Sequence, residues 1–541
     1  MRERFENFVS VISARPRLSA LVLGLVSACG YPPLHGWWIA LPALAGFVWL
    51  LHSVQSWRAA AWLGWLFGWA HLTLANNWIA TAFTHQAKMP EFLGWLAVPL
   101  LCVYLAIYPA IAAALTHVVM RKRVGERRGF LAFGVAFAGF WIVTEWLRSW
   151  IFTGYPWPPL GLLLLGGWES AGIAKLLPWL GTYGLSGLAV FLASLIAFAV
   201  RERHFFWASA GALVIALVMM APLNGEIKLP SEGIRYVVVQ PLITQDEIND
   251  ASKFDEHFAR LSGLSAPGQG EPRLVLWPES AIPDYLEDGY PQRYYDRLTA
   301  GKDPVFARRR LGAIAGEGST LLTGVINLNF AEIEGQQRVV TARNSVIGIN
   351  GDGAINGQYP KAHLVPYGEY LPMEWLLGRF GLDRLTAGTV PYEAGPGPRT
   401  LDIGAQGKAG IQVCYEIVFS GQVVDRANRP DYIFNPSNDG WFGWWGPPQH
   451  LAQARMRAIE EGLPVLRSTT TGISAVIDAN GIVLGTVPSG EAGRIDGYIP
   501  AANPQTLFSL IGNALPLGWA TLLIGLALIL PRLLAQRSER G

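Results

Sequence analysis

The sequence has little charge for its length. Only 15% of its 541 residues are Asp, Glu, Lys or Arg, whereas soluble globular domains carry about 25%. Hydrophobic residues make up 51% of the chain, and the net charge is only +2. No basic tract has aromatic residues interleaved with it, so we expect no nucleic-acid partner. The composition is typical of a chain that lies partly in lipid.

Cysteine is scarce as well. Cys29 and Cys102 fall in apolar stretches, where we expect them to be structural fillers. Cys414 is the only cysteine in a long polar block, so it has no disulfide partner there. A lone thiol is either buried and inert or kept for its reactivity, and its position alone favours the inert interpretation. Cys and His form no cluster at ligand spacing, so we expect neither a metal nor another cofactor.

Long apolar runs dominate residues 1–222 and return only near the C-terminus. Because a bilayer requires about 20 apolar residues per helix, the sequence predicts about eight spans. Between two of them, residues 150–180 are apolar but broken by prolines, which predicts an interfacial or re-entrant segment. The predicted spans lie near 18–34, 37–52, 59–78, 93–120, 129–147, 185–200, 205–222 and 506–530.

Basic residues alternate with these spans. They gather in the N-terminal segment, in every second connection and in the C-terminal tail, and the opposite connections hold few. Basic residues favour the cytoplasmic side. We therefore predict cytoplasmic termini and a block at 223–505 outside the cytoplasm. The first set is Arg2, Arg4, Arg15, Arg17, Arg58, Arg121, Lys122, Arg123, Arg127, Arg128, Arg201, Arg203, Arg532, Arg537 and Arg540, and the opposite set is Lys88, Arg148 and Lys175.

The block at 223–505 has the pattern of an α/β domain. Short apolar runs, which are typical of strands buried on both faces, alternate with helix-like stretches. The sequence thus predicts three parts: a helical bundle at 1–222, a catalytic domain at 223–505, and a final span with its tail at 506–541. The predicted strands are 236–239, 274–277, 321–325, 345–349, 410–413 and 431–434, and the predicted helices are roughly 252–263, 290–300, 304–315 and 447–462.

Two reactive side chains of this block follow predicted strands, and a third follows a proline that we expect to mark another strand end. Cys414 follows the run 410–413, Glu279 follows a strand and Pro278, and Lys361 follows Pro360. Residues at the carboxyl ends of strands project from the sheet edge, where α/β proteins place their chemistry. Glu279 would take the thiol proton, Lys361 would favour the thiolate, and Cys414 would carry an acyl group.

Each of these residues also has a plainer interpretation. Taken alone, Glu279 and Lys361 are more often solvated surface charges. His363 lies close to Lys361 in the sequence, but no Asp or Asn is obviously placed to orient it, so we expect a structural role.

The motifs around the three residues resemble those of the nitrilase, or carbon–nitrogen hydrolase, superfamily. They occur in the order Glu, Lys, Cys, as Trp277–Ser280, Lys361–Tyr370 and Cys414–Glu416, with Asn435–Gly443 as further support. Together with the predicted spans, the whole chain resembles the apolipoprotein N-acyltransferases. The resemblance implies an α+β membrane protein with an αββα sandwich, a triad of Glu279, Lys361 and Cys414, and supporting roles for Glu369, Tyr415 and Glu416.

The resemblance also implies a reaction and a location. Cys414 would accept an acyl chain from the sn-1 ester of a phospholipid, with phosphatidylethanolamine as the expected donor. It would pass this chain to the N-terminal amine of a diacylglyceryl-cysteine in an apolipoprotein. The enzyme would lie in the bacterial inner membrane with its catalytic domain in the periplasm.

Two alternatives remain open from the sequence. A tethered amidase or nitrilase for a small soluble substrate would need one anchor rather than eight spans. A transporter or receptor would place ionisable residues inside its spans, and the predicted spans hold few, chiefly His71, His117 and Glu145. The apolar segments 155–159 and 441–446 could contact lipid or simply pack in the interior.

Overall fold

The computed structural model describes residues 14–85, 92–120, 129–221, 229–266, 271–373, 375, 379 and 390–539, with side chains up to residue 529. The described parts of Met1–Thr84, Lys88–Gly225 and Thr506–Gly541 form one compact unit, called here the helical unit. Those of His85–Ala87 and Glu226–Gln505 form a second, the sheet unit. Several basic residues used for the topology prediction lie outside the described residues, namely Arg2, Arg4, Lys88, Arg121, Lys122, Arg123, Arg127, Arg128 and Arg540.

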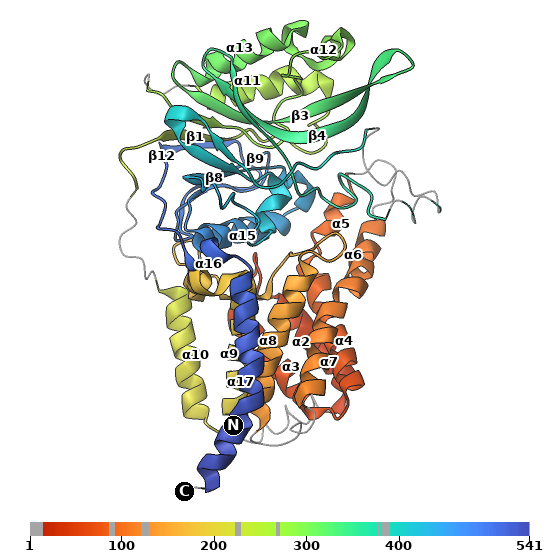
Figure 1. Cartoon of the computed structure of the whole chain (residues 1–541), viewed down its shortest axis with the longest axis vertical. Helices are drawn as coiled ribbons and strands as arrows, with labels where there is room; N and C mark the ends of the chain where they lie inside the picture. The colour runs from red at the N-terminus through yellow and green to blue at the C-terminus, as the bar shows by residue number, and fades with distance from the viewer. Residues whose placement is uncertain are drawn as a thin grey trace. The chain divides into compact units, whose positions relative to one another are not determined.

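The helical unit consists of apolar helices that lie side by side (Figure 1). Among the described residues, three helical stretches are long and apolar enough to cross a membrane: Phe92–Met120, Phe130–Arg148 and Ile173–Arg201. Four further apolar helices are shorter, so the number of eight spans stays a prediction. The helices are α2 (Pro16–Ala28), α3 (Trp37–Ser53), α4 (Trp57–Ala75), α5 (Ile79–Ala82), α6 (Phe92–Leu105), α7 (Ile107–Met120), α8 (Phe130–Arg148), α9 (Leu177–Arg201), α10 (Phe205–Met220), α16 (Leu507–Ile511) and α17 (Ala514–Glu539).

Several helices differ from the predicted spans. α2 ends at Ala28 rather than near residue 34, and the predicted span 93–120 is divided between α6 and α7. The predicted span 185–200 is the second part of α9, which begins earlier at Leu177. The predicted span 506–530 is divided between α16 and α17, because Gly512 between them has a φ of 60° that ends the first helix.

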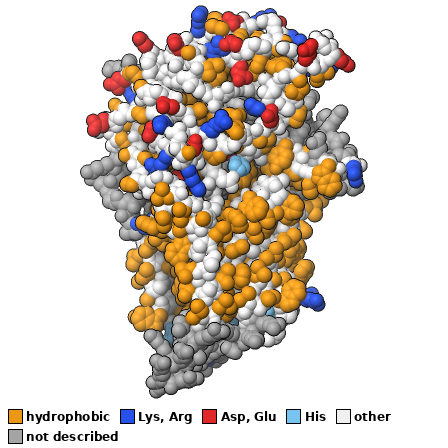
Figure 2. All heavy atoms as spheres, viewed as in Figure 1, with side chains coloured by type: hydrophobic (Ala, Val, Ile, Leu, Met, Phe, Trp, Pro, Cys, Tyr) orange, Lys and Arg blue, Asp and Glu red, His pale blue; other side chains and the backbone are white. Residues whose placement is uncertain are grey.

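Hydrophobic side chains cover most of the visible face of the helical unit (Figure 2). Trp38, Trp95 and Trp207 are between 64% and 70% exposed. An apolar surface of this extent is typical of helices that pack against lipid.

The proline-rich segment 150–180 forms no continuous helix. It contains two short 3-10 helices, η2 (Leu160–Leu164) and η3 (Ile173–Leu176), and the leucines of η2 are buried. Two charged residues of α8 hold its backbone: Glu145 accepts a hydrogen bond from the Leu160 N–H at 2.8 Å, and Arg148 donates one to the Pro158 carbonyl at 2.9 Å. The ionisable Glu145 thus has a structural partner in the chain itself.

The sheet unit is built on two six-stranded mixed sheets. The first has the order β12-β1-β2-β3-β4-β5 and the second β11-β10-β9-β8-β7-β6. The first sheet contains β1 (Arg235–Gln240), β2 (Leu274–Leu276), β3 (Thr320–Ile333), β4 (Gln336–Asn350), β5 (Ile355–Pro360) and β12 (Gly493–Tyr498). The second contains β6 (Thr400–Asp402), β7 (Lys408–Ile411), β8 (Tyr432–Ser437), β9 (Val465–Thr469), β10 (Ser474–Ile477) and β11 (Val483–Val487).

The two sheets face each other, and helices cover their outer sides (Figure 1). Polar bonds join the sheets: Ser468 of β9 donates to the Val239 carbonyl of β1 at 2.6 Å, and Thr469 donates to Gln240 at 2.8 Å. Helices α11 (Phe254–Leu264) and α13 (Pro304–Ala315) pack on the first sheet, and α15 (Gly446–Glu461) packs on the second. The helix α12 (Gln292–Leu298) lies beside α13 in Figure 1. This is the αββα sandwich that the resemblance implies.

The parallel strands explain where a site can form. β1, β2 and β3 run parallel to one another, as do β7, β8 and β9. The carboxyl ends of β2 and β7 lead to Glu279 and Cys414. Lys361 directly follows β5.

Candidate active site

Cys414 lies at a sharp turn after β7. Its φ is 52°, a left-handed conformation that is uncommon for a residue with a side chain. The residue starts the short 3-10 helix η8 (Cys414–Val418) and is 5% exposed. Burial, followed by the charge of Glu279, raises the pKa of the thiol, and Lys361 opposes this rise. The thiol therefore needs a neighbouring base before it can act as a nucleophile.

Glu279 is held by one donor from β4 and one from the residue that directly follows β8. Its Oε1 accepts a hydrogen bond from the Asn344 side chain at 2.7 Å, and its Oε2 accepts one from the Asn438 N–H at 2.8 Å. The same Asn438 N–H also faces the Cys414 sulfur. The carboxylate and the thiol thus share one backbone donor, which places the base beside the proton it would take.

Lys361 is a buried ammonium between two carboxylates. Its Nζ lies 3.5 Å from Glu279 Oε1 and 2.9 Å from Glu369 Oε2, and its side chain is 1% exposed. Burial lowers the pKa of Lys361, but the charges of Glu369 and Glu279 outweigh burial and raise it overall. The side chain is therefore a fixed positive charge at neutral pH, suited to stabilise a thiolate or an oxyanion.

Asn344 is a site residue that the sequence analysis missed. It lies on β4, and its backbone carbonyl accepts a hydrogen bond from the Lys361 N–H at 2.8 Å. Its side-chain amide donates to Glu279 at 2.7 Å and to Glu369 at 3.0 Å. No local motif marks this asparagine, because only the pairing of β4 with β5 brings it to the lysine.

Glu416 connects the chain around Lys361 with the chain around Cys414. Its Oε1 accepts hydrogen bonds from the Ala362 and His363 N–H groups at 2.7 and 3.1 Å, and its Oε2 accepts one from the Val413 N–H at 2.8 Å. Burial raises the pKa of Glu416 to about 7. The Glu416 side chain therefore holds the two turns together.

The other predicted residues lie close by. Tyr415 is 4% exposed and packs against Phe419 with a ring-centroid distance of 5.1 Å. His363 stacks on the same Phe419 at 4.2 Å, and burial lowers its pKa. In the Trp-rich segment 441–446, Phe442 is 8% exposed and Trp444 is 69% exposed, so the segment is divided between the interior and the surface.

A buried polar network contacts the backbone carbonyl of Cys414, and the sequence analysis did not single it out. His450 on α15 lies with Nε2 3.1 Å from the Cys414 carbonyl oxygen and with Nδ1 3.0 Å from Asp439. Arg467 on β9 donates to Asp439 at 2.6 Å. Asp439 falls within the motif 435–443, which was the only signal available in the sequence.

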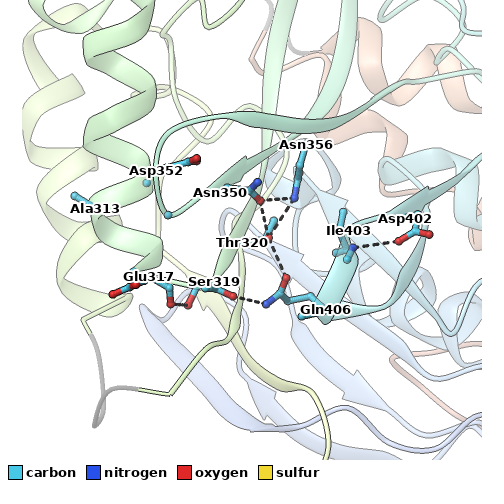
Figure 3. A pocket seen from close by; sticks show the side chains of 16 residues that line it. Ala313, Glu317, Ser319, Thr320, Asn350, Asp352, Asn356, Asp402, Ile403 and Gln406 are labelled. Atoms are coloured by element: carbon cyan, nitrogen blue, oxygen red, sulfur yellow. Dashed lines mark hydrogen bonds between the residues drawn. The ribbon is translucent and has the colours of Figure 1, made fainter.

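An open groove of about 810 Å³ lies elsewhere on the sheet unit (Figure 3). Thr320, Asn350 and Gln406 are among the residues that line it, and they point toward one another. Thr320 begins β3, whereas Glu279 follows the end of the parallel strand β2. The groove therefore lies at the opposite ends of the strands from Cys414, and none of the three reactive side chains lines it.

The arrangement suits nucleophilic catalysis at a carbonyl carbon. It combines a thiol, a carboxylate and a fixed ammonium with the turn that carries the thiol. Within the described part of the chain, no group of three His, Cys, Asp or Glu could hold a metal ion.

Comparison with known proteins gives two family matches. Residues 23–195 match the model of the apolipoprotein N-acyltransferase N-terminal domain, and residues 243–503 match that of carbon–nitrogen hydrolases. Among solved structures, the chain is similar to the E41L mutant of the amidase from Nesterenkonia sp. AN1, with 17% identity, a TM-score of 0.33, and coverage of 54% of this chain and 96% of that chain.

Curated relatives match almost the entire chain. The apolipoprotein N-acyltransferase of Rhodopseudomonas palustris is 31% identical over 94% of this chain and 94% of its own length. That of Bradyrhizobium diazoefficiens is 32% identical over 95% of this chain and 94% of its own length. Since both domains and their order agree over this length, the chain belongs to the apolipoprotein N-acyltransferase family.

Proposed function

We propose that this protein acylates apolipoproteins through a thioester on Cys414. The acyl donor is the sn-1 ester of a phospholipid, and the expected phospholipid is phosphatidylethanolamine. The acceptor is the α-amine of a diacylglyceryl-cysteine at a lipoprotein N-terminus. Membership of the family supports the acyltransferase activity itself, and the donor, the acceptor chemistry and the residue roles are parts of this proposal.

In the first half-reaction, Glu279 takes the thiol proton and the sulfur attacks the ester carbonyl. Lys361 and the Tyr415 N–H stabilise the oxyanion of the tetrahedral intermediate. When that intermediate collapses, the glycerol C–O bond breaks. The departing alkoxide takes the proton from Glu279 and leaves as a lysophospholipid, while the acyl chain stays on Cys414.

In the second half-reaction, the amine of the acceptor attacks the thioester. Glu279 takes a proton from the nitrogen, the C–S bond breaks, and the proton passes to the sulfur. The product is an amide, and the enzyme returns to its starting state by a ping-pong sequence. Glu369 fixes the lysine, at 2.9 Å from its ammonium, and Glu416 holds the two turns.

We propose further that about eight spans hold the protein in the bacterial inner membrane, with the sheet unit in the periplasm and both termini in the cytoplasm. Both substrates carry acyl chains that stay in lipid, so a membrane-embedded enzyme meets them without extracting them. Water must be kept from the thioester, because hydrolysis would turn the transferase into a phospholipase.

The observation that carries the proposal is the Cys414 turn, with φ 52° and with Glu279 and Lys361 acting on its thiol. The purified protein is incubated with phosphatidylethanolamine, without acceptor, and examined by intact and peptide mass spectrometry. We expect an acyl adduct on Cys414 that disappears when a diacylated lipopeptide is added.

The variant Cys414→Ala should form no adduct and no amide product, and Cys102→Ala serves as its matched control. Cys102 is buried on α6 and takes no part in the proposed chemistry. An unmodified Cys414 in the active wild-type protein would refute the thioester. Hydrolysis of small amides by the purified protein, without any acyl transfer from lipid, would refute the proposed substrate class.

A further inference from the structure

The peptide bond between Cys414 and Tyr415 is held by a buried histidine. The Cys414 carbonyl oxygen lies 3.1 Å from Nε2 of His450. A carbonyl oxygen can only accept, so Nε2 must carry the proton and donate it. His450 has no exposed surface, and it comes from α15, more than thirty residues along the chain.

The other side of the imidazole is fixed as well. Nδ1 of His450 lies 3.0 Å from Asp439 and 3.0 Å from Arg467, and Arg467 donates to Asp439 at 2.6 Å. All three side chains are fully buried or nearly so. Burial, followed by the charge of Arg467, lowers the pKa of His450, and Asp439 opposes this change. Nε2 carries a proton in both the neutral and the charged form of a ring that donates to a carbonyl.

Peptide geometry then transmits this contact to the reacting centre. In a planar trans peptide the C=O and N–H groups point in opposite directions. The imidazole that fixes the Cys414 oxygen therefore also fixes the direction of the Tyr415 N–H. We propose that His450 is a positioning residue that aims the Tyr415 N–H at the oxyanion of the acyl-transfer intermediate. This inference rests on the proposed function, which uses that N–H as an oxyanion donor.

The peptide plane at this turn needs a hydrogen bond to hold its orientation. Cys414 is in the sparsely populated left-handed region although it begins the 3-10 helix η8, which runs on to Val418. Rotation of the single peptide plane between Cys414 and Tyr415 would turn the N–H away and leave both Cα atoms in place. The thiol would then keep its position while the oxyanion lost a donor.

This separation defines the experiment. The full-length protein is prepared with His450→Leu, which removes the donor, and with His450→Gln, whose amide can reach the Nε2 position. His257→Leu is the matched control, because His257 is 4% exposed and lies on α11, which packs on the first sheet, whereas α15 packs on the second. Two rates are measured for each protein: thioester formation from phosphatidylethanolamine in a single turnover, and alkylation of Cys414 by iodoacetamide.

Alkylation displaces iodide at a saturated carbon and forms no oxyanion, so it reports only the position and ionisation of the thiol. We expect His450→Leu to slow thioester formation about 10- to 100-fold, a smaller fall in rate than complete removal of an oxyanion donor causes. The apparent KM for lipid and the alkylation rate should not change. His450→Gln should recover most of the rate, and His257→Leu should match the wild type. In addition, the carbonyl stretch of the trapped thioester should move to higher frequency in His450→Leu.

Three results would overturn the inference. The first is a His450→Leu protein that forms the thioester at the wild-type rate. The second is an equal fall of alkylation and thioester formation, which would mean that the thiol itself has moved. The third is a His450→Gln protein as slow as His450→Leu. Failure of the wild type to form any thioester would instead refute the proposed function, and this inference with it.

Discussion

At the scale of single residues, the candidate site balances two buried carboxyl groups and a partly buried one against one buried ammonium. Glu279, Glu369 and Glu416 lie in or beside the site with Lys361, which is 1% exposed. Buried charges of this kind cost several kcal/mol to desolvate and persist only when they are paired and hydrogen-bonded. Each carboxylate oxygen of Glu279 and Glu369 has a donor from Asn344, Lys361 or a backbone N–H. Removal of one donor therefore leaves a negative charge in the site without its partner.

Asn344 tests this balance directly. Asn344→Asp keeps the shape of the side chain but replaces an N–H donor by a carboxylate next to Glu279 and Glu369. Like charges at this distance repel, so Glu279 should lose the donor to its Oε1 and be displaced from its position. We expect acyl transfer to fall about 100-fold, as for loss of a positioned general base, and to recover partly at lower pH in a pH–rate profile. Asn350→Asp, in the distant groove, is the matched control and should keep the wild-type profile. A normal profile in Asn344→Asp would contradict the prediction.

Glu416 should make stability depend on pH. Its pKa is raised from the model-peptide value of 4.5 to about 7, mainly by burial. Between these values the folded protein holds a proton that the unfolded chain has released, so the free energy of unfolding falls as pH rises from about 4.5 to about 7. The size of the effect is about 3 kcal/mol. Thermal unfolding midpoints in detergent, measured from pH 4.5 to 8, should fall less steeply for Glu416→Gln. Parallel curves for the two proteins would show that Glu416 does not titrate in this range.

At the scale of elements, strand ends and close backbone contacts position the reactive groups. β2 and β3 are parallel, and the chain after β2 runs directly over Gly324 of β3. A Cβ on Gly324 would lie 2.6 to 2.8 Å from backbone atoms of Pro278, Glu279 and Ser280. The absence of a side chain at Gly324 is therefore what lets Glu279 approach the site.

The variant Gly324→Ala should displace the backbone of Glu279. A shift of about 1 Å in a catalytic group costs about 100-fold in rate, so we expect a loss of this order in kcat. Gly357→Ala on β5 is the matched control, since its Cβ would meet only the Leu401 side chain at an ordinary 3.5 Å. Single-turnover thioester formation is the measurement. Equal rates for the two variants would mean that the Glu279 segment adapts without cost.

At the scale of the whole molecule, the chain combines two units of opposite surface character. Exposed aromatic and aliphatic side chains cover the visible face of the helical unit, and charged side chains are spread over that of the sheet unit (Figure 2). The family of the chain and its apolar helices suggest a membrane protein. The side of the membrane on which the sheet unit and the termini lie is predicted only from the distribution of basic residues, so it needs its own test.

Cysteine labelling would provide this test. Ser489→Cys lies on the exposed surface of the sheet unit, and Gln55→Cys lies in the exposed connection before α4. A membrane-impermeant maleimide added to spheroplasts should label Ser489→Cys at once and Gln55→Cys only after permeabilisation. The wild type supplies the background, because Cys102 and Cys414 are buried and Cys29 is partly buried. The reverse labelling pattern would overturn the predicted topology.

The sequence by itself determined the features that depend on local order. Apolar runs predicted six of the twelve strands among the described residues, because a strand buried on both faces must be apolar. Short motifs around Glu279, Lys361 and Cys414 indicated the family, which the comparisons confirm. Strands such as β5 and β12 were missed, because their mixed polar pattern becomes a strand only through pairing with a neighbour.

Only the tertiary structure decided which distant residues support the reactive ones. Asn344 reaches Glu279 because β3 pairs with both β2 and β4, and His450 reaches the Cys414 carbonyl because α15 packs against the turn. Neither contact leaves a mark in the local sequence, since it depends on the register of strands and the packing of a helix far along the chain. Local propensity can place a reactive side chain at the end of a strand, but the direction of its hydrogen-bond partners is set by long-range packing.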